Sequence, residues 1–300
     1  MSESTIHDLG YKRYVGTRQP TSRRWRVIAR QQIASSWQTF FRYKAWLVSA
    51  VIVTVIAAVF IFIATDKRWH LGHGVQQTFA NMALPFALDW YGRLAFIITL
   101  RIGSGVIAGD FQRGAFTFYF ARSTRPIDYL LGKVGGLGAL LGIVLVGAPL
   151  AVALMRIGLA GAGSTDELVP QLWLVPKVLA IGGLATLAYT TVPLAFSALV
   201  ENRRYALGVW AAWYLIAGPV AYGIGRVTHL PLAALDIAAS VKSITLHLLD
   251  APVTPWGQSV YDLPSLTASI TSLAIQIVLA TAIVLWRLDA AQRSGVGGAT

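Results

Sequence analysis

The chain has no cysteine among its 300 residues. Disulfides, thiolate metal sites and a cysteine nucleophile are therefore excluded, although the lack of cysteine does not identify a compartment. Methionine is scarce, with 3 residues, which argues against the handling of soft metal ions. Charge is scarce as well, because only 13% of the residues are Asp, Glu, Lys or Arg.

Apolar residues take the place of charged ones. They make up 55% of the sequence, and the mean hydropathy of +0.59 lies far outside the range of soluble domains. Runs of about 18 apolar residues can cross a bilayer core as helices. Six such runs predict an all-α polytopic membrane protein with six transmembrane helices: Trp46 to Ala64, Phe86 to Ala108, Val134 to Met155, Val178 to Leu199, Ala206 to Gly225 and Leu266 to Trp286.

The basic residues predict the orientation, because cytoplasmic loops hold the excess of Lys and Arg. Of the 25 Lys and Arg residues, nine precede the first run, four lie in 110–133, two in the turn after the fourth run and two in the tail. The opposite side has only Lys67, Arg68, Arg156, Arg226 and Lys242. Both termini are therefore expected to be cytoplasmic. The net charge of +12 is explained by this bias and by membrane lipids as partners, so no nucleic acid is expected.

Three parts follow from this layout: a cytoplasmic segment 1–45, a transmembrane domain 46–286 and a cytoplasmic tail 287–300. No cleavable signal peptide is expected, because a long polar and basic segment precedes the first run. In that segment Trp25, Ile28, Ile33, Trp37 and Phe40 recur at helical spacing. This pattern predicts an amphipathic helix in the headgroup plane, with an ordinary juxtamembrane anchor as the alternative.

Three charged residues interrupt the second run: Asp89, Arg93 and Arg101. Charges at membrane depth require partners, and Asp89 and Arg93 can pair along one helical face. Arg101 is expected roughly toward the same side. Two interpretations stay open: a polar cavity that contacts substrate or acts as a gate, or a structural ion pair with an arginine that reaches the headgroups.

The outer loops and the glycines carry weaker signals. His70 and His73 lie near Asp66, but a pair without further ligands does not predict a metal site. The outer loop 226–264 is long enough to form its own helix near 230–249, either partly re-entrant or as a surface cap. Gly105 and Gly109 form a G-x-x-x-G pattern that predicts close helix packing or a homodimer seam.

Motifs for chemistry are missing from the sequence. The Gly132-Lys133 pair has Ile127 where a phosphate loop needs its first glycine, and Val134 follows in place of Ser or Thr. The sequence also has no H-E-x-x-H and no G-x-S-x-G. The chain is therefore not expected to be an enzyme, nor to hold a cofactor itself.

The most specific stretch is the connector 110–133, which lies between the second and third runs. It contains Asp110, Gly114, Arg122, Arg125, Asp128, Gly132 and Lys133, together with the aromatic residues Phe116, Phe118, Tyr119 and Tyr129. We expect 110–120 to extend the second helix, 121–126 to turn and 127–133 to restart a helix. The connector resembles that of ABC-2 type transporter permeases, although Ser123 and Pro126 depart from the family pattern.

The resemblance implies a homodimeric permease in the bacterial cytoplasmic membrane, assembled with two copies of a separate ATP-binding subunit. ATP and Mg would bind that partner, and the direction of transport would be export. The coupling residues would be Asp110, Phe116, Phe118, Tyr119, Arg122, Arg125, Asp128, Tyr129 and Lys133. The alternatives are an ATP-independent secondary carrier and a non-transporting membrane anchor for a cytoplasmic partner.

Overall fold

The computed structural model describes residues 24–42, 44–65, 72–121, 124–161, 171–228, 230–251, 253, 257 and 259–293. These residues are helical apart from turns and short connections. Among these residues, six helices are long and apolar enough to cross a membrane, as the sequence predicts: Val48–Thr65, Thr78–Gln112, Pro126–Leu159, Leu174–Leu199, Arg203–Thr228 and Leu266–Arg293. Apart from the first, these spans are longer than the apolar runs because the helices continue into flanking polar residues.

The first, fourth and sixth spans are single helices: α2 (Lys44–Thr65), α9 (Leu174–Leu199) and α13 (Leu266–Arg293). The other three contain a five-residue π-helical stretch. The second joins α3 (His73–Ile98), η3 (Thr99–Gly103) and α4 (Val106–Gln112); the third joins α6 (Pro126–Gly142), η4 (Ile143–Gly147) and α7 (Ala148–Gly161); the fifth joins α10 (Arg203–Ala212), η5 (Trp213–Ala217) and α11 (Gly218–Thr228). Stretches of this kind change which face of a helix meets the core and are frequent at functional sites.

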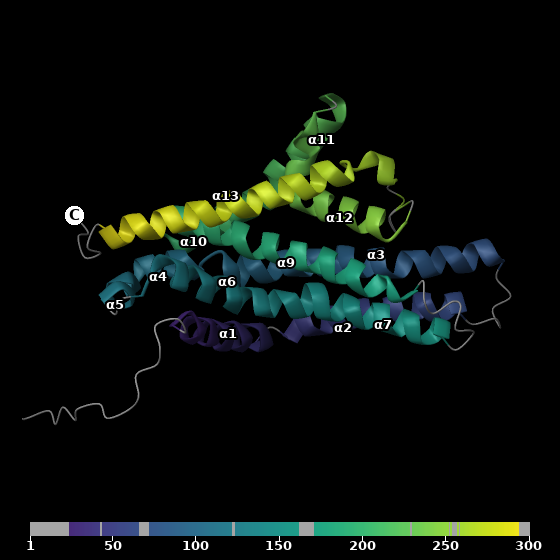
Figure 1. Ribbon diagram of the computed structural model, residues 1–300, viewed down its shortest axis with the longest axis horizontal. Helices are drawn as coiled ribbons and strands as arrows, with labels where there is room; N and C mark the ends of the chain where they lie inside the picture. Colours follow the sequence, from purple (N-terminus) through teal and green to yellow (C-terminus); the bar gives the residue numbers. More distant parts are fainter. Residues whose placement is uncertain are drawn as a thin grey trace, which may run out of the picture.

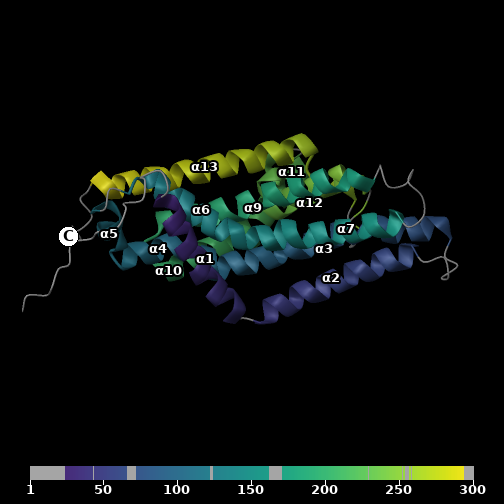
Figure 2. The same cartoon turned by 60° about the horizontal axis from the view of Figure 1, so that its bottom comes forward.

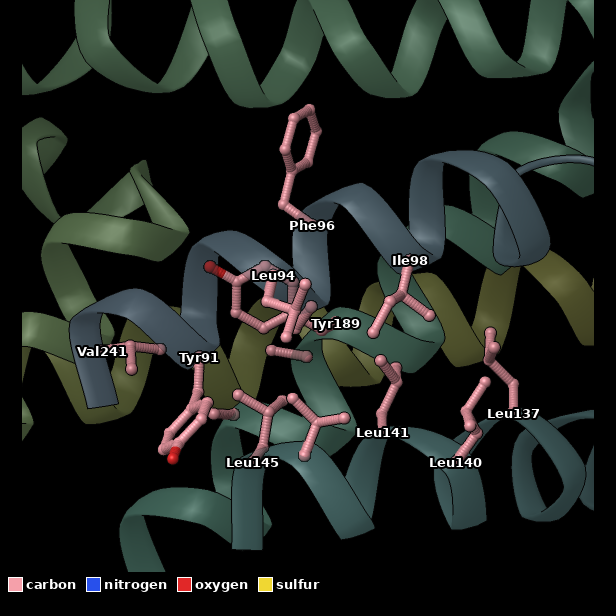
Figure 3. Packing of buried hydrophobic residues seen from close by; sticks show 14 of the residues in the cluster. Tyr91, Leu94, Phe96, Ile98, Leu137, Leu140, Leu141, Leu145, Tyr189 and Val241 are labelled. Atoms are coloured by element: carbon pink, nitrogen blue, oxygen red, sulfur yellow. The ribbon is translucent and has the colours of Figure 1, made fainter. Parts of the chain in front are cut away.

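Most residues of the second and fourth spans are buried, whereas only a minority of the residues in the first, fifth and sixth spans are buried. Figure 3 shows the centre of the bundle, where Ile98 of α3 faces Leu141 of α6 and both side chains are fully buried. Phe96 points to the opposite side of α3, and its ring stacks on Tyr214 at 3.9 Å between centroids. The peripheral spans leave large apolar side chains exposed.

Shorter helices gather at one end of the bundle, at the left of Figures 1 and 2. They are α1 (Arg24–Arg42), α4 and α5 (Ala115–Ala121), and they lie near the C-terminal end of α13. We call this end of the bundle the α5 end. In Figure 2, α1 runs obliquely across the bundle, at a steep angle to α2 and α3. The N-terminal helix and the C-terminal end of the last span therefore lie at the same end of the bundle, as expected for an even number of spans.

The segment between the fifth and sixth spans folds against the bundle. It forms η6 (Pro231–Leu235), α12 (Ile237–Leu248) and η7 (Val260–Asp262), and α12 contacts α3, α9 and α13. Asp236 begins α12 by accepting the N–H groups of Ala238 and Ala239 at 2.9 and 3.2 Å, which is the role of an N-cap. The expected helix near 230–249 is thus shorter and is preceded by a 3₁₀ turn, and most of it is buried.

Candidate functional site

In the connector between the second and third spans, a turn separates two short helices. The helix α4 ends at Gln112, and Gly114 has φ of +62°, a conformation that favours glycine, before α5 starts at Ala115. The predicted uninterrupted extension over 110–120 is therefore divided at this glycine. Pro126 occupies the first turn of α6, where its missing N–H costs nothing, so the helix restarts where a proline is best tolerated.

A buried polar network joins this connector to the spans. Asp110 of α4 lies 2.8 Å (Oδ2) from Nζ of Lys133 on α6, and the Tyr129 hydroxyl donates to the same oxygen at 2.7 Å. Lys133 also donates to Oε1 of Gln32 on α1 at 3.2 Å, and Gln32 donates to Ser36 at 3.1 Å. All five side chains are buried. Because a buried charge is tolerated only with its partner, this network fixes α1, α4 and α6 relative to one another.

Two glycines of α6 bring α1 close enough for that contact. A Cβ atom at Gly132 would lie 2.6 Å from Cβ of Ile28, and one at Gly136 would lie 2.4 Å from Cβ of Gln32. Both distances are too short for real atoms, so only glycine allows the two helices this approach. The pattern Gly132-Lys133-x-x-Gly136 therefore positions Lys133 and makes room for α1, the helix that carries its partner Gln32.

Aromatic rings fill the space around the network. Phe116 is fully buried and contacts Phe111 at 4.4 Å, Phe120 at 5.6 Å and Tyr129 at 5.2 Å between ring centroids. The ring of Tyr119 packs edge-on against Tyr129. The Tyr119 pKa is raised by burial and by the negative charge of Asp110, and the nearby Arg113 opposes this shift. These contacts attach α5 to α6 through rings rather than through backbone hydrogen bonds.

The structure divides the predicted coupling residues into two groups. Asp110, Phe116, Tyr129 and Lys133 are buried inside the chain, so their side chains do not form part of its surface. Arg125 is exposed, while Asp128 and Tyr119 are half-buried. Arg122 lies outside the described residues, and the side chain of Phe118 is not described. The four side chains of the first group are therefore not exposed for a direct contact, and the coupling role of the predicted residues stays a prediction.

Sequence reasoning missed two polar partners of the connector. Gln32 and Ser197 reach it from α1 and α9, and both are buried. The Ser197 hydroxyl accepts the N–H groups of Ile107 and Ala108, each at 3.0 Å, and so caps the start of α4 from another helix. Neither residue stands in a pattern that would reveal this, because the contacts depend on how the helices pack.

A second polar site lies between the spans. Asp89 pairs with Arg93 of the same helix at 3.0 Å, as predicted, and its other oxygen lies 3.2 Å from Nζ of Lys242 on α12. These side chains line a cavity of about 410 Å³ between α3, α9, η5 and α12, where the hydroxyls of Tyr189 and Tyr214 are 3.0 Å apart. The cavity combines three charged groups with apolar walls, a combination suited to a ligand that is polar at one end.

Arg101 does not join this cavity. It lies in η3, is exposed, and lines a separate cavity at the α5 end. The expectation that Arg101 faces the same side as Asp89 and Arg93 is therefore wrong. Arg93 and Arg101 are eight residues apart, about 12 Å along a helix, so Arg101 lies at a different depth in the bundle.

Among the outer residues singled out from the sequence, His70 and Asp66 lie outside the described residues, and the side chain of His73 is not described. No protein-family model and no curated protein matches this chain.

Proposed function

We propose that this chain is the membrane-spanning subunit of an ABC-2 type exporter in a bacterial cytoplasmic membrane, energised by a separate ATP-binding subunit. The observation that carries the proposal is the construction of the connector. The helix α5 and the start of α6 lie at one end of the bundle, while the Asp110–Lys133–Gln32 network and the rings around Phe116 attach them to the spans. A partner that pushed on such a unit would move the spans with it.

The contact surface for the ATP-binding subunit is formed in this proposal by exposed residues of the connector. Arg125 and Thr117 are exposed, Asp128 is half-buried, and Ile127 keeps 43% of its surface accessible. A charged rim around an apolar side chain suits a short helix that lies in a groove of another protein. The buried residues Asp110, Tyr129 and Lys133 serve as internal support, which transmits displacement to the spans without touching the partner.

Orientation follows from the same proposal. The α5 end holds Arg24, Arg113, Arg125, Arg203 and Arg293, so the positive-inside rule favours a cytoplasmic location for it. The helix α1, which crosses the bundle at this end, would lie in the headgroup region as an elbow helix. A second copy of the chain would cover part of the exposed apolar surface of the outer spans.

A second candidate is an ATP-independent secondary carrier. The observation that favours it is the Asp89–Arg93–Lys242 cluster, because ionisable groups that line a cavity at membrane depth often mark the path of an ion or substrate. In a carrier of this kind the chain would transport its substrate without any ATPase.

Co-purification and reconstitution distinguish the two candidates. Tagged full-length chain, extracted in mild detergent from its source cells, is expected to retain a stand-alone ATP-binding protein in equal numbers of subunits. ATP hydrolysis by that protein is expected to depend on the chain in liposomes. Cargo movement by the purified chain alone, driven by an ion gradient, would favour the carrier.

The absence of cysteine makes orientation directly testable. Gln292→Cys places a single thiol near the end of α13 at the α5 end, and Tyr261→Cys places one near its opposite end, where Tyr261 is 94% exposed. A membrane-impermeant maleimide added to intact cells is expected to label only the second variant. Labelling of Gln292→Cys alone would place the connector outside the cell and end the proposal.

A further inference from the structure

The cavity that Asp89, Arg93 and Lys242 line, which we call the Asp89 cavity, has the size of a small-molecule site. Its volume is about 410 Å³. Binding sites for small molecules commonly measure about 300–1,000 Å³ and combine mainly apolar walls with a few converging polar groups. A volume near the lower end of this range suits a small ligand with one short chain better than a lipid with two acyl chains.

Two tyrosine hydroxyls leave one hydrogen-bond donor of this cavity without an acceptor. Tyr189 of α9 and Tyr214 of η5 both line the cavity, and their hydroxyl oxygens lie 3.0 Å apart. Each hydroxyl has one hydrogen, so whichever tyrosine donates to the other, the second hydrogen has no acceptor among the described residues. Tyr189 is only 1% exposed. Because a buried hydroxyl without an acceptor is unfavourable, this donor requires an acceptor inside the cavity.

The ammonium group of Lys242 supplies further donors. Its nitrogen lies 3.2 Å from Oδ1 of Asp89, which is its ion-pair partner among the described residues. An ammonium has three N–H donors, so this contact leaves two of them for a ligand. The Lys242 side chain is 20% exposed, and solvent therefore screens its charge only in part.

The charge of the lining favours a negative ligand. Arg93 and Lys242 approach the two oxygens of one carboxylate, that of Asp89, at 3.0 and 3.2 Å. Two cations and one anion leave an excess of one positive charge among the described residues of the lining. Asp236 is close to Lys242 but does not line the cavity, and its carboxylate accepts the N–H groups at the start of α12. An anionic group beside Lys242 is therefore attracted.

Apolar side chains form most of the remaining wall. Phe96, Val241 and Leu246 line the cavity and are buried. Ile97 and Leu215 also line it, and they are 45% and 59% exposed, so the cavity reaches the outside of the bundle between α3 and η5. A short apolar chain can lie along this wall while its polar head stays beside Lys242.

We propose that the Asp89 cavity binds an anionic amphiphile with a single short apolar chain. The head accepts hydrogen bonds from Lys242 and from the Tyr189–Tyr214 pair, and the chain packs against Phe96 and Val241. Such a ligand joins α3, η5, α9 and α12. The inference concerns binding alone, so it rests neither on the exporter nor on the carrier.

The test measures binding to the full-length chain in phosphatidylcholine nanodiscs, with binding to empty nanodiscs subtracted. The probes are decanesulfonate, decanol and decylammonium, which share one chain and differ in the charge of the head. Decanesulfonate is expected to bind about tenfold or more tightly than the other two, because only its head is an anion that accepts charge-assisted hydrogen bonds. Equal affinities for the three probes, or tightest binding of decylammonium, would overturn the proposal.

Substitutions at Lys242 locate the site. K242M keeps a side chain of similar length and is expected to weaken decanesulfonate binding about tenfold or more, whereas K242R keeps the charge and should stay within about threefold of wild type. The matched control is K177M, which removes the cation of the Lys177–Asp250 pair outside the cavity. Its affinity for decanesulfonate is expected to equal that of wild type.

The double variant Y189F/Y214F keeps the test decisive if K242M does not fold. It removes both hydroxyls and keeps both rings and every charge, and it is expected to weaken decanesulfonate binding about fivefold or more. Wild-type affinity in each cavity variant that folds would overturn the proposal. Because no ATPase or ion gradient is present, that result is distinguishable from a failure of the proposed transport function.

Discussion

Lys242, on the short helix α12, lies 3.2 Å from Asp89 of the second span. The helix α12 belongs to the segment between the fifth and sixth spans, yet it brings a cation to a carboxylate that already pairs with Arg93 on its own helix. The Asp89 side chain is 11% exposed and that of Lys242 is 20% exposed, so solvent screens this pair only in part. The contact attaches α12 to α3 beside the cavity.

We expect Asp89 and Lys242 to be energetically coupled. In a double-mutant cycle of D89N and K242M, the free energy of unfolding in detergent should show a coupling of about 1–2 kcal/mol, as for a partly buried ion pair. The comparison pair Lys177–Asp250 is 2.8 Å apart, and its Asp250 side chain is 81% exposed. Its coupling should be at most about 0.5 kcal/mol. Equal couplings for the two pairs would show that burial of Asp89 has no energetic effect.

Removing the Asp110 charge should destabilise the connector strongly. D110N leaves the Lys133 cation buried without its counter-ion, which is expected to cost about 3–5 kcal/mol of unfolding free energy. The double variant D110N/K133M removes both charges and should recover most of that loss. The control is D289N, at the exposed Asp289–Arg293 pair, with an expected change of about 0.5 kcal/mol or less. If D110N/K133M were as unstable as D110N alone, the loss of stability could not be caused by the unpaired Lys133 cation.

Close packing of α1 on α6 should depend on Gly136. G136A places a methyl group against Gln32 and should cost about 1–3 kcal/mol, typical of overpacking, while moving α1 away from α6. Spin labels at Arg30→Cys and Leu131→Cys, both exposed positions, can report that movement in this cysteine-free chain. The control is G142A on the same helix, where a Cβ atom meets nothing within 4 Å. An unchanged label distance in G136A would show that the contact tolerates a side chain.

The stability contributed by Asp236 should depend on pH. Burial raises the pKa of this carboxyl, while its bonds to the N–H groups of Ala239 and Ala238 and the charge of Lys242 oppose the shift. An acid with a raised pKa binds its proton more tightly in the folded state, so its ionised form costs stability above that pKa. As pH falls through the raised pKa toward the ordinary value of 3.8, wild type should gain stability relative to D236N.

Asn caps a helix as well as Asp does, so D236N should keep the start of α12 and isolate the effect of charge. D236A should lose about 1 kcal/mol at every pH, because the cap itself is removed. Thermal unfolding midpoints of the three proteins between pH 4 and neutrality provide the comparison. A difference between wild type and D236N that stays constant with pH would rule out the raised pKa.

The proposed contact with the ATP-binding subunit should depend on Arg125 and Asp128. Because these side chains lie on the accessible part of the connector, R125A/D128A should weaken association with that subunit about tenfold or more and lower chain-dependent ATP hydrolysis, without changing the unfolding midpoint. The control R293A removes an exposed arginine at the end of α13. Wild-type association and hydrolysis in the double variant would remove both residues from the mechanism.

The sequence by itself determined the six spans and the Asp89–Arg93 pair. Hydropathy is summed along a contiguous segment, and residues four apart share a helix face, so both are local properties that need no knowledge of packing. Only the tertiary structure decided what surrounds the connector. Lys133 meets Gln32 across 101 positions of sequence, and α4 is capped by Ser197 from 89 and 90 positions away.

Tertiary packing also decided two points that the local pattern does not contain. Arg101 lines the cavity at the α5 end and not the Asp89 cavity, and Asp110, Phe116, Tyr129 and Lys133 are buried. A motif shows which residue types are present, but the face that each one presents depends on helix register and on which neighbours cover it. Those are set by the packing of all the helices together, because burial is a property of the whole bundle.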